Sequence, residues 1–324
     1  MIQTQTLHAR TKPYARDYSW KSWWCILSTI FFLAAAVAGT LPILPMPARV
    51  LCSGLTGLLI VRIFVIYHDQ QHRAILPKSH VAAMLMRVVG IFLACPSSTW
   101  RASHDYHHTH NCKLRSANIG SFPIMTTEQY RQTPAGDRFL YLFMRHPLTI
   151  VLGYVTVFIF GMVIVPFFKS PRKSIDSVPA LMLHGAVAVW LTIHFGWLAL
   201  ILTMLLPFLI AGALGSYLFY AQHNFPGVIL KDKAGWTYEG AALESSSFLK
   251  TNAIMAWFTG NIGYHHIHHI NHRVPFYRLP EIYRDIPEFR CATATSLHPR
   301  EIFRCLRLKV WCVETQRMMS VRGL

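Results

Sequence analysis

Three long stretches of the chain contain no Asp, Glu, Lys or Arg, and they restrict the possible folds more than any other feature. They cover residues 22–48, 147–168 and 177–230 of the 324. About 20 apolar residues suffice for a helix to cross a bilayer, so the first stretch holds one such helix and the third has room for two. Residues 50–67 are a further candidate, interrupted only by Arg62. A soluble helical core would not need charge-free runs of this length, so the sequence predicts a polytopic membrane protein.

The candidate membrane helices pair into two hairpins. We predict the first over residues 23–67, with a proline-rich turn, and the second over residues 178–222. Residues 79–94 are too short to cross and read as a helix lying in the membrane interface. The stretch 148–168 is long enough to cross, but basic residues flank both of its ends. We interpret it as a re-entrant or interfacial segment, because a full crossing would place the histidine-rich segments on opposite membrane faces.

Charge is scarce and unevenly placed. Only 14% of the residues are charged, against about 25% in a typical soluble domain, and the formal net charge is +17. The basic residues gather in the N-terminal arm, in the histidine-rich segments and along the C-terminal tail, which is the positive-inside pattern. Both termini and the histidine-rich loops are therefore predicted to be cytoplasmic. Contact with anionic lipid explains the excess, so no nucleic-acid partner is expected. The seven cysteines form no C-x-x-C pair and indicate a reducing compartment.

We predict an all-α fold with about four transmembrane helices and a cytoplasmic helical cap. The chain shows no repeats and no second soluble domain. A basic arm of residues 1–22 precedes a single domain of residues 23–324. Within that domain, the cap is expected to consist of residues 68–147 together with residues 223–324, which include the tail.

Histidine is concentrated in four places. Twelve of the 18 histidines lie in "HDQQH" (68–72), "HDYHHTH" (104–110), "QHN" (His223) and "HHIHHINH" (265–272). The first motif has the i, i+4 spacing and the two longer ones contain i, i+3, i+4, so each projects neighbouring imidazoles from one helical turn. All four places fall on the predicted cytoplasmic edge of the membrane. Neutral imidazoles are common ligands of Fe, Zn, Cu and Ni, so the pattern predicts a metal centre.

The other histidines are expected to have different roles. His110, His266 and His272 fall outside the repeated spacing and are interpreted as surface residues or neighbours of the ligands. His184 and His194 lie inside a predicted membrane helix, where polar contacts between helices are expected. Surface positions are expected for the remaining ones, which are His8, His80, His146 and His298.

The motifs "HDQQH", "SHDYHHTHN", "LFYAQHNF" and "WFTGNIGYHHIHHINHRVPFYRLPE" closely resemble those of the integral-membrane fatty acid desaturases, in the same order. The resemblance extends from His68 to about Leu279 and is nearest to the acyl-lipid branch with delta-12 and bacterial delta-5 type enzymes. It implies a di-iron centre with nine histidine ligands, which are His68, His72, His104, His107, His108, His223, His265, His268 and His269. "QQ" stands where many relatives have Cys-Gly, and Asn224 where relatives often have Gln. Neither departure removes a ligand.

The resemblance also implies the reaction. An alkyl chain, O2, two electrons and two protons would give a cis-alkene and two waters, with the chemistry carried by the two iron ions. The substrate would be a membrane lipid or an acyl thioester in a closed apolar tunnel. The chain lacks a Rossmann glycine fingerprint, a cysteine set for an iron–sulfur cluster and a His-Pro-Gly-Gly haem motif. Electrons would therefore come from a separate donor, such as ferredoxin or a small cytochrome.

Two sets of residues are expected around the metal. A ligating histidine usually donates its other N–H to a carboxylate or carbonyl. Candidates for this role beside the motifs are Asp69, Asp105, Asn224, Glu244 and Asn261. Aromatic candidates for the tunnel wall are Trp100, Trp190, Trp197, Phe219 and Trp257.

Two other functions remain open from the sequence. A hydroxylase or ketolase with the same histidine motifs would act on an alkane, a carotenoid or a sphingolipid. A metal transporter or sensor would instead need ionisable ligands along a path through the membrane. The histidines gather at one edge, which favours an enzyme.

Overall fold

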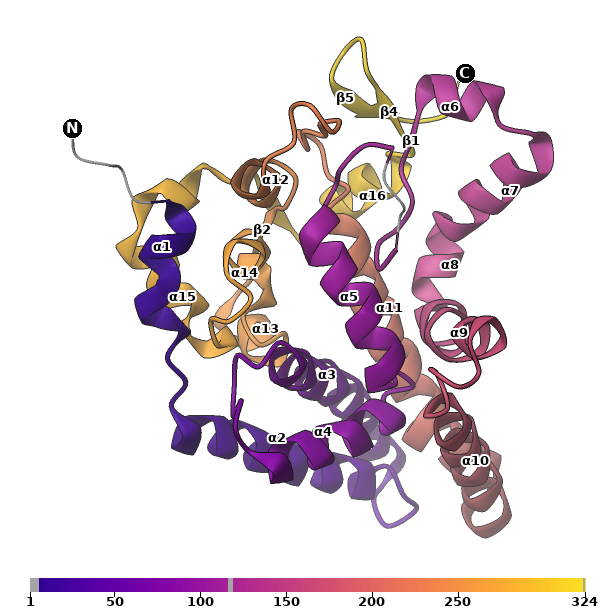
Figure 1. Ribbon diagram of the computed structural model, residues 1–324. Helices are drawn as coiled ribbons and strands as arrows, with labels where there is room; N and C mark the ends of the chain where they lie inside the picture. The colour runs from indigo at the N-terminus through magenta and orange to yellow at the C-terminus, as the bar shows by residue number, and fades with distance from the viewer. Residues whose placement is uncertain (1–5, 116–118, 323) are drawn as a thin grey trace.

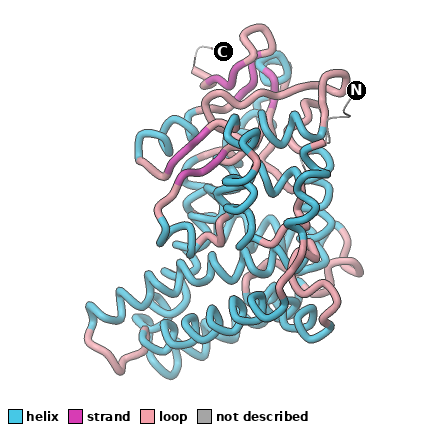
Figure 2. The backbone as a smooth tube through the Cα atoms, turned by 90° about the vertical axis from the view of Figure 1, so that its left-hand side faces the viewer, coloured by secondary structure: helices cyan, strands magenta, loops and turns pink. Residues whose placement is uncertain are grey.

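The computed structural model describes residues 6–115, 119–322 and 324, and these are predominantly helical (Figures 1 and 2). Three helical stretches are long and apolar enough to cross a membrane: Ser19–Gly39, Met46–Gln71 and Ser177–Ala221. Their outward faces expose large apolar side chains such as Phe31 (68% exposed) and Ile193 (72%), which only lipid would cover favourably. The predicted all-α membrane fold is confirmed.

The first hairpin consists of α2 (Ser19–Gly39) and α3 (Met46–Gln71). The two helices approach closely at the turn, where a Cβ on Gly39 would lie 2.5 Å from the Cys52 sulfur. Arg62, the charge that interrupts the apolar run, is buried; it donates to the Thr29 hydroxyl and lies 3.9 Å from the Trp257 ring centre. Neutral partners and an aromatic face thus accommodate the guanidinium inside the helix packing.

The second hairpin consists of α10 (Ser177–Leu200), a short π-helical turn (η3, Ile201–Leu205) and α11 (Leu206–Ala221). A straight helix of these 45 residues would measure about 68 Å, about twice the bilayer core. The chain folds back instead at Gly196, which has φ 80° and ψ 176°. His184 and Phe208 lie at equal distances before and after Gly196 in the sequence. Because the chain reverses there, their rings come within 5.0 Å of each other between centres. The long run therefore supplies two antiparallel helices.

The segments between the hairpins pack against both of them. α4 (His80–Phe92) meets α5 (Ser97–His110) at a bend of 94°. The apolar segment that follows the cap forms α8 (Pro147–Val151), the π-helix η2 (Tyr154–Ile164) and α9 (Val165–Lys169). η2 lies so close to α11 that a Cβ on Gly212 would come within 2.3 Å of the Tyr154 nitrogen. Glycine is therefore required at this crossing.

The rest of the chain forms the cap above the hairpins (Figure 1). Its short strands are β1 (Met125–Thr126), β2 (Phe248–Lys250), β3 (Ala294–Ser296), β4 (Val310–Cys312) and β5 (Arg317–Met319). β4 pairs with β1 in parallel and with β5 antiparallel, and β2 pairs with β3 in parallel. Helices of the cap are α6 (Thr127–Gln132), α7 (Ala135–Met144), α12 (Tyr238–Glu244), α13 (Ala253–Phe258), α14 (His265–Ile270), α15 (Leu279–Asp285) and α16 (Pro299–Arg307), with short 3-10 turns at Ile262–Tyr264, Phe276–Arg278 and Pro287–Cys291. The β1–β4 and β2–β3 pairs thus connect the C-terminal tail to earlier parts of the cap.

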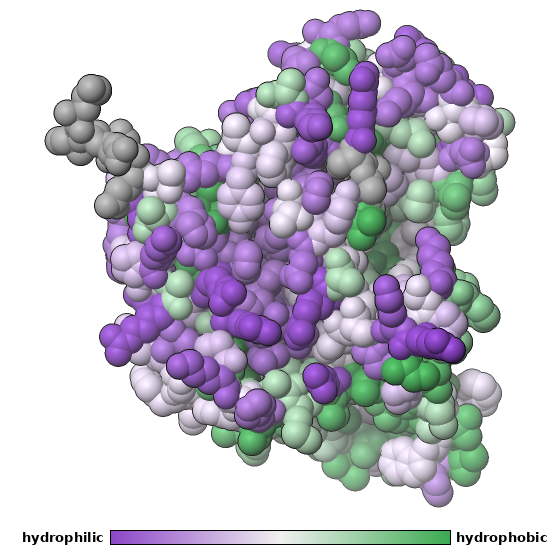
Figure 3. All heavy atoms as spheres, in the orientation of Figure 1, coloured by the Kyte–Doolittle hydropathy of each residue, from purple (hydrophilic) through white to green (hydrophobic). Residues whose placement is uncertain are grey.

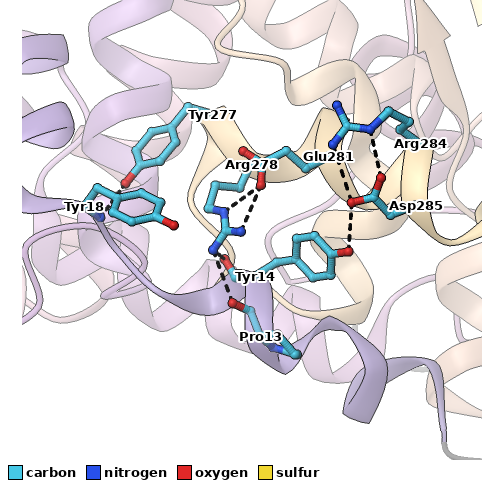
Figure 4. Close-up of polar contacts among 8 residues, drawn as sticks. All are labelled: Pro13, Tyr14, Tyr18, Tyr277, Arg278, Glu281, Arg284 and Asp285. Atoms are coloured by element: carbon cyan, nitrogen blue, oxygen red, sulfur yellow. Dashed lines mark hydrogen bonds and ion pairs between the residues drawn. The ribbon is translucent and has the colours of Figure 1, made fainter.

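The described part of the N-terminal arm packs onto the cap as α1 (Leu7–Thr11) and the 3-10 turn η1 (Lys12–Ala15). The Tyr14 hydroxyl donates to Asp285, and Arg278 donates to the carbonyls of Pro13 and Tyr14 while pairing with Glu281 (Figure 4). Residues 19–22, expected in the arm, already belong to α2.

Candidate metal centre

Four separate elements bring the histidine motifs together. The first motif ends α3, the second forms the last turns of α5, His223 follows directly after α11, and α14 carries the third. Figure 1 shows these four helices side by side in the middle of the molecule. The histidines therefore converge although up to two hundred residues separate them along the chain.

Nine histidines form two adjoining buried groups. The ligand atoms of each group lie within 4.8 Å of one another. The first group consists of His68, His72, His104, His108 and His268, and the second of His107, His223, His265 and His269. The groups touch where the rings of His108 and His269 lie 4.5 Å apart between centres. These are the nine residues that the resemblance named as ligands.

Helical geometry explains how each long motif serves both groups. Residues at i and i+4 are about 40° apart around a helix, whereas residue i+3 lies about 60° away on the other side of residue i. On α5, His104 and His108 accordingly enter the first group and His107 enters the second. On α14, His265 and His269 enter the second group and His268 the first. Each motif thus gives a pair to one group and a single ring to the other.

The Nε2 atoms converge within each group. Nε2 of His104 lies 3.1 Å from that of His68 and 3.0 Å from that of His108, and His108 Nε2 lies 3.1 Å from that of His268. In the second group, Nε2 of His223 lies 3.2 Å from that of His107 and 2.9 Å from that of His265. A ring nitrogen has one proton or one lone pair in its plane, so it cannot serve two such neighbours by hydrogen bonding.

A metal ion fits this arrangement better than hydrogen bonds do. Imidazole nitrogens bind first-row metals at about 2.1 Å, so two ligands at right angles lie about 3.0 Å apart. Six Nε2–Nε2 contacts within the groups measure 2.9–3.2 Å. The two groups are thus suited to hold one ion each, with ligands that consist only of imidazole.

Burial keeps these imidazoles neutral. Desolvation, followed by repulsion from neighbouring imidazoles, holds the pKa values of His265, His268 and His269 well below the usual histidine value. Desolvation lowers the pKa of His223 to about 4, partly offset by its bond to the Ser245 carbonyl. Neutral rings offer lone pairs at physiological pH, which metal binding requires.

These pKa values predict acid sensitivity of the metal-free protein. Unfolded histidines have a pKa of about 6.5, so below that pH the unfolded chain takes up protons that the buried rings refuse. The free energy of unfolding therefore has its full value above about pH 6.5. It decreases as the pH falls toward about 4, the pKa of His223 in the folded protein. Thermal unfolding of chelator-treated protein should show Tm decreasing from pH 7 to pH 5. A constant Tm over this range would contradict the burial of neutral rings.

Two ligand rings are oriented by hydrogen bonds on the side away from the centre. His68 Nδ1 lies 3.1 Å from Asp69 Oδ1, and the other carboxylate oxygen accepts the Phe276 N–H at 2.6 Å. His223 Nδ1 lies 3.0 Å from the Ser245 carbonyl oxygen. Each contact fixes which nitrogen carries the proton and leaves Nε2 free for metal.

The other four expected orienting residues have other hydrogen-bond or ion-pair partners or are exposed. Asp105 is exposed on the outer face of α5, and Glu244 pairs with Lys231 at 2.7 Å. Asn261 donates to the Phe276 carbonyl. Asn224 accepts from Arg145 and donates to the Cys305 carbonyl, so it ties α11 to the tail instead. The sequence did not predict that the Ser245 carbonyl orients His223, because every residue type has a backbone carbonyl.

An apolar cavity of about 250 Å³ adjoins the centre. Trp100 and Phe219 form part of its wall; Trp100 stacks on His104 at 4.1 Å, and the Phe219 ring lies 6.1 Å from that of His104. The other expected tunnel aromatics lie elsewhere. Trp190 and Trp197 are 51% and 71% exposed on α10, and Trp257 lies over Arg62.

Comparison with known proteins agrees with the site. The family model for fatty acid desaturases matches residues 44–298. A Bacillus subtilis protein named fatty acid desaturase is 27% identical over 91% of this chain and 82% of its own length. An sn-1 oleoyl-lipid 12-desaturase of Synechocystis is 24% identical over 80% of this chain and 74% of its own. An sn-1 acyl-lipid omega-3 desaturase (ferredoxin) of Nostoc is 23% identical over 69% and 63%. The chain belongs to the fatty acid desaturase family and is therefore an oxidoreductase.

Proposed function

We propose that the protein is a di-iron, O2-dependent desaturase that introduces a cis double bond into the acyl chain of a membrane lipid. The observation that carries the proposal is the pair of buried, all-imidazole groups beside an apolar cavity. Imidazole suits iron, and two adjoining sites would let two irons share the electrons that O2 reduction needs. The nine histidines would be the ligands, and both termini and the centre would face the cytoplasm.

The bound irons would supply the oxidant that an unactivated C–H bond requires, while the protein supplies position and exclusion of water. The overall change converts –CH2–CH2–, O2, two electrons and two protons into –CH=CH– and two waters. Asp69 and the Ser245 carbonyl hold the rings of His68 and His223 in the orientation that points Nε2 inward. Trp100, buried against His104, closes the first group on the side of the cavity.

Hydrophobic burial would hold the acyl chain in the cavity. Each buried methylene contributes about 0.8 kcal/mol, so affinity alone does not select a carbon pair. Selection must come from the length and bend of the cavity. Its walls continue through Phe64 and Phe158 into a second apolar cavity between α3 and α11. This continuation offers the far end of an acyl chain further apolar space between the helices.

Filling the cavity should impair turnover without disturbing the metal. Gly161 lines the cavity, and a Cβ there would meet only the Thr156 carbonyl oxygen, at 3.5 Å. Gly161→Leu should reduce conversion of long acyl chains about tenfold or shift the preference to shorter ones, because one bulky side chain occupies the path. Gly185→Leu is the matched control, since Gly185 faces open space on α10. Iron content and fatty-acid profiles would be measured for both; equal profiles would exclude this cavity as the acyl site.

Electrons would come from a separate donor such as ferredoxin or a small cytochrome. The Nostoc relative is named for ferredoxin. The net charge of +17 supports attraction of an acidic donor, whose association would weaken as salt increases.

Lipid analysis of an expressing host tests the proposal. New cis double bonds, located by chromatography and mass spectrometry of methyl esters, are the expected result. New hydroxyl or keto groups would instead identify a hydroxylase or ketolase, and an unchanged lipid profile with an active donor present would contradict both.

A further inference from the structure

An unpartnered apolar face lies on α7 (Ala135–Met144), within the cap. Phe139, Leu140 and Phe143 are 72%, 53% and 50% exposed and lie on one side of the helix, whereas Tyr141 on the opposite side is buried. The rings of Phe139 and Phe143 stack at 6.4 Å between centres. This is the pattern of an amphipathic helix whose apolar side needs a cover.

The face continues directly into the membrane segment. On α8 and at the start of η2, the same helical spacing exposes Leu148, Val151, Leu152 and Val155, which are 45–62% exposed. Figure 3 shows hydrophobic side chains over the lower part of the molecule around α10 and up its right-hand edge toward α8 and α7, while much of the upper surface is hydrophilic. The apolar surface of α7 is thus an extension of the surface that lipid covers.

The inner side of the same three helices forms the wall of the cavity. Met144 at the end of α7, Thr149 on α8 and Thr156 on η2 line it together with Trp100 and Phe219. One layer of helix therefore separates the acyl cavity from the lipid-facing surface. This arrangement places the cavity one helix layer from the leaflet, and its wall includes Trp100, which stacks on His104.

We propose that α7 lies in the cytoplasmic leaflet and forms one side of a lateral entrance through which the acyl chain of a bilayer lipid reaches the cavity. Continuity with the membrane segment selects lipid as the occupant of the face. Basic residues that suit anionic headgroups lie in the helices before and after this apolar stretch, Arg131 on α6 and Lys169 at the end of α9. The proposal rests on the desaturase function and adds that the substrate enters sideways as an intact lipid.

Depth-dependent quenching tests the membrane contact without any need for activity. Phe139→Cys is labelled with bimane in full-length protein that carries Cys291→Ser, since Cys291 is an exposed thiol, and is reconstituted in nanodiscs. Label at residue 139 should be quenched by lipid nitroxides and not by an aqueous nickel chelate, after subtraction of the labelled parent. Val313→Cys, at an exposed apolar position in the tail, is the matched control and should show the reverse. Aqueous quenching at residue 139 would overturn the proposal. Protection from both quenchers that is lost on dilution would also overturn it, because a second copy of the chain would then cover the face.

Kinetics test the entrance itself. Phe139→Ser with Phe143→Ser should raise KM for lipid presented in nanodiscs roughly tenfold with kcat unchanged, because binding through the leaflet is lost while the centre is intact. Val313→Ser should leave KM unchanged. A short-chain substrate dispersed in detergent should be converted equally by all variants. Equal KM values in nanodiscs would overturn the entrance, whereas a wild-type protein that converts neither substrate would contradict the desaturase function and leave the quenching result standing.

Discussion

Replacement of His268 by alanine should abolish desaturation and lower the iron content of the purified protein from about two per chain toward one. His268 is 1% exposed and its Nε2 lies 3.1 Å from that of His108, so its loss removes one nitrogen from the first group. Alanine has no lone pair to offer a metal ion, and the space that the imidazole leaves would admit water. His269→Ala should act on the second group in the same way. Metal analysis of both variants would measure the two sites separately.

Control positions follow from the structure. His80 is exposed at the start of α4, outside both groups, and His80→Ala should retain iron and activity. His8 looked equally suitable in the sequence, but its Nδ1 lies 2.8 Å from the Ile270 carbonyl at the end of α14, so it is a poorer control. A His268→Ala protein with full iron and full turnover would contradict the proposed ligand set.

Asp69→Asn should reduce iron affinity and activity about 10- to 100-fold, the usual effect of losing a partner behind a ligating histidine. The carboxylate accepts from His68 Nδ1 on one oxygen and from the Phe276 N–H on the other. Asparagine has a single oxygen, so one donor would lose its acceptor and would face an NH2 group instead. Iron titration and turnover in the same preparation would measure both consequences.

Asp105→Asn is the matched control for Asp69→Asn. Each aspartate directly follows a histidine of the first group, yet Asp105 is exposed and should tolerate the change. If the two variants behaved alike, the orienting role of Asp69 would be wrong.

This pair of aspartates also shows what sequence can and cannot predict. Helical spacing within a motif is local, so the neighbouring imidazoles of His104 and His108 were expected from sequence alone. The partner of a side chain depends on distant segments. Asp69 is buried because the chain near Phe276 packs over the end of α3, whereas Asp105 is exposed. The same His-Asp pair therefore has different surroundings at the two positions.

The membrane helices likewise show which features the sequence predicts and which it does not. Apolar runs predicted the approximate positions of the helical stretches that are long enough to cross a membrane, because bilayer thickness sets helix length. They predicted a second hairpin over residues 178–222 but did not mark Gly196 as the point of reversal, since the run continues without a charge on both sides of it. Asn224 was expected to orient a ligand ring because it follows His223, but its side-chain oxygen accepts a hydrogen bond from the buried Arg145. A tertiary contact decided the surroundings of Asn224.

Metal and product analysis of a single preparation tests the central claim most directly. Purified protein in nanodiscs, supplied with a reduced donor, O2 and lipid, should contain two irons per chain and form one double bond for each O2 consumed. Loss of iron to a chelator should stop the reaction, and readdition of Fe2+ should restore it. Full activity in preparations that contain no iron, or in which iron content and turnover vary independently, would contradict the account.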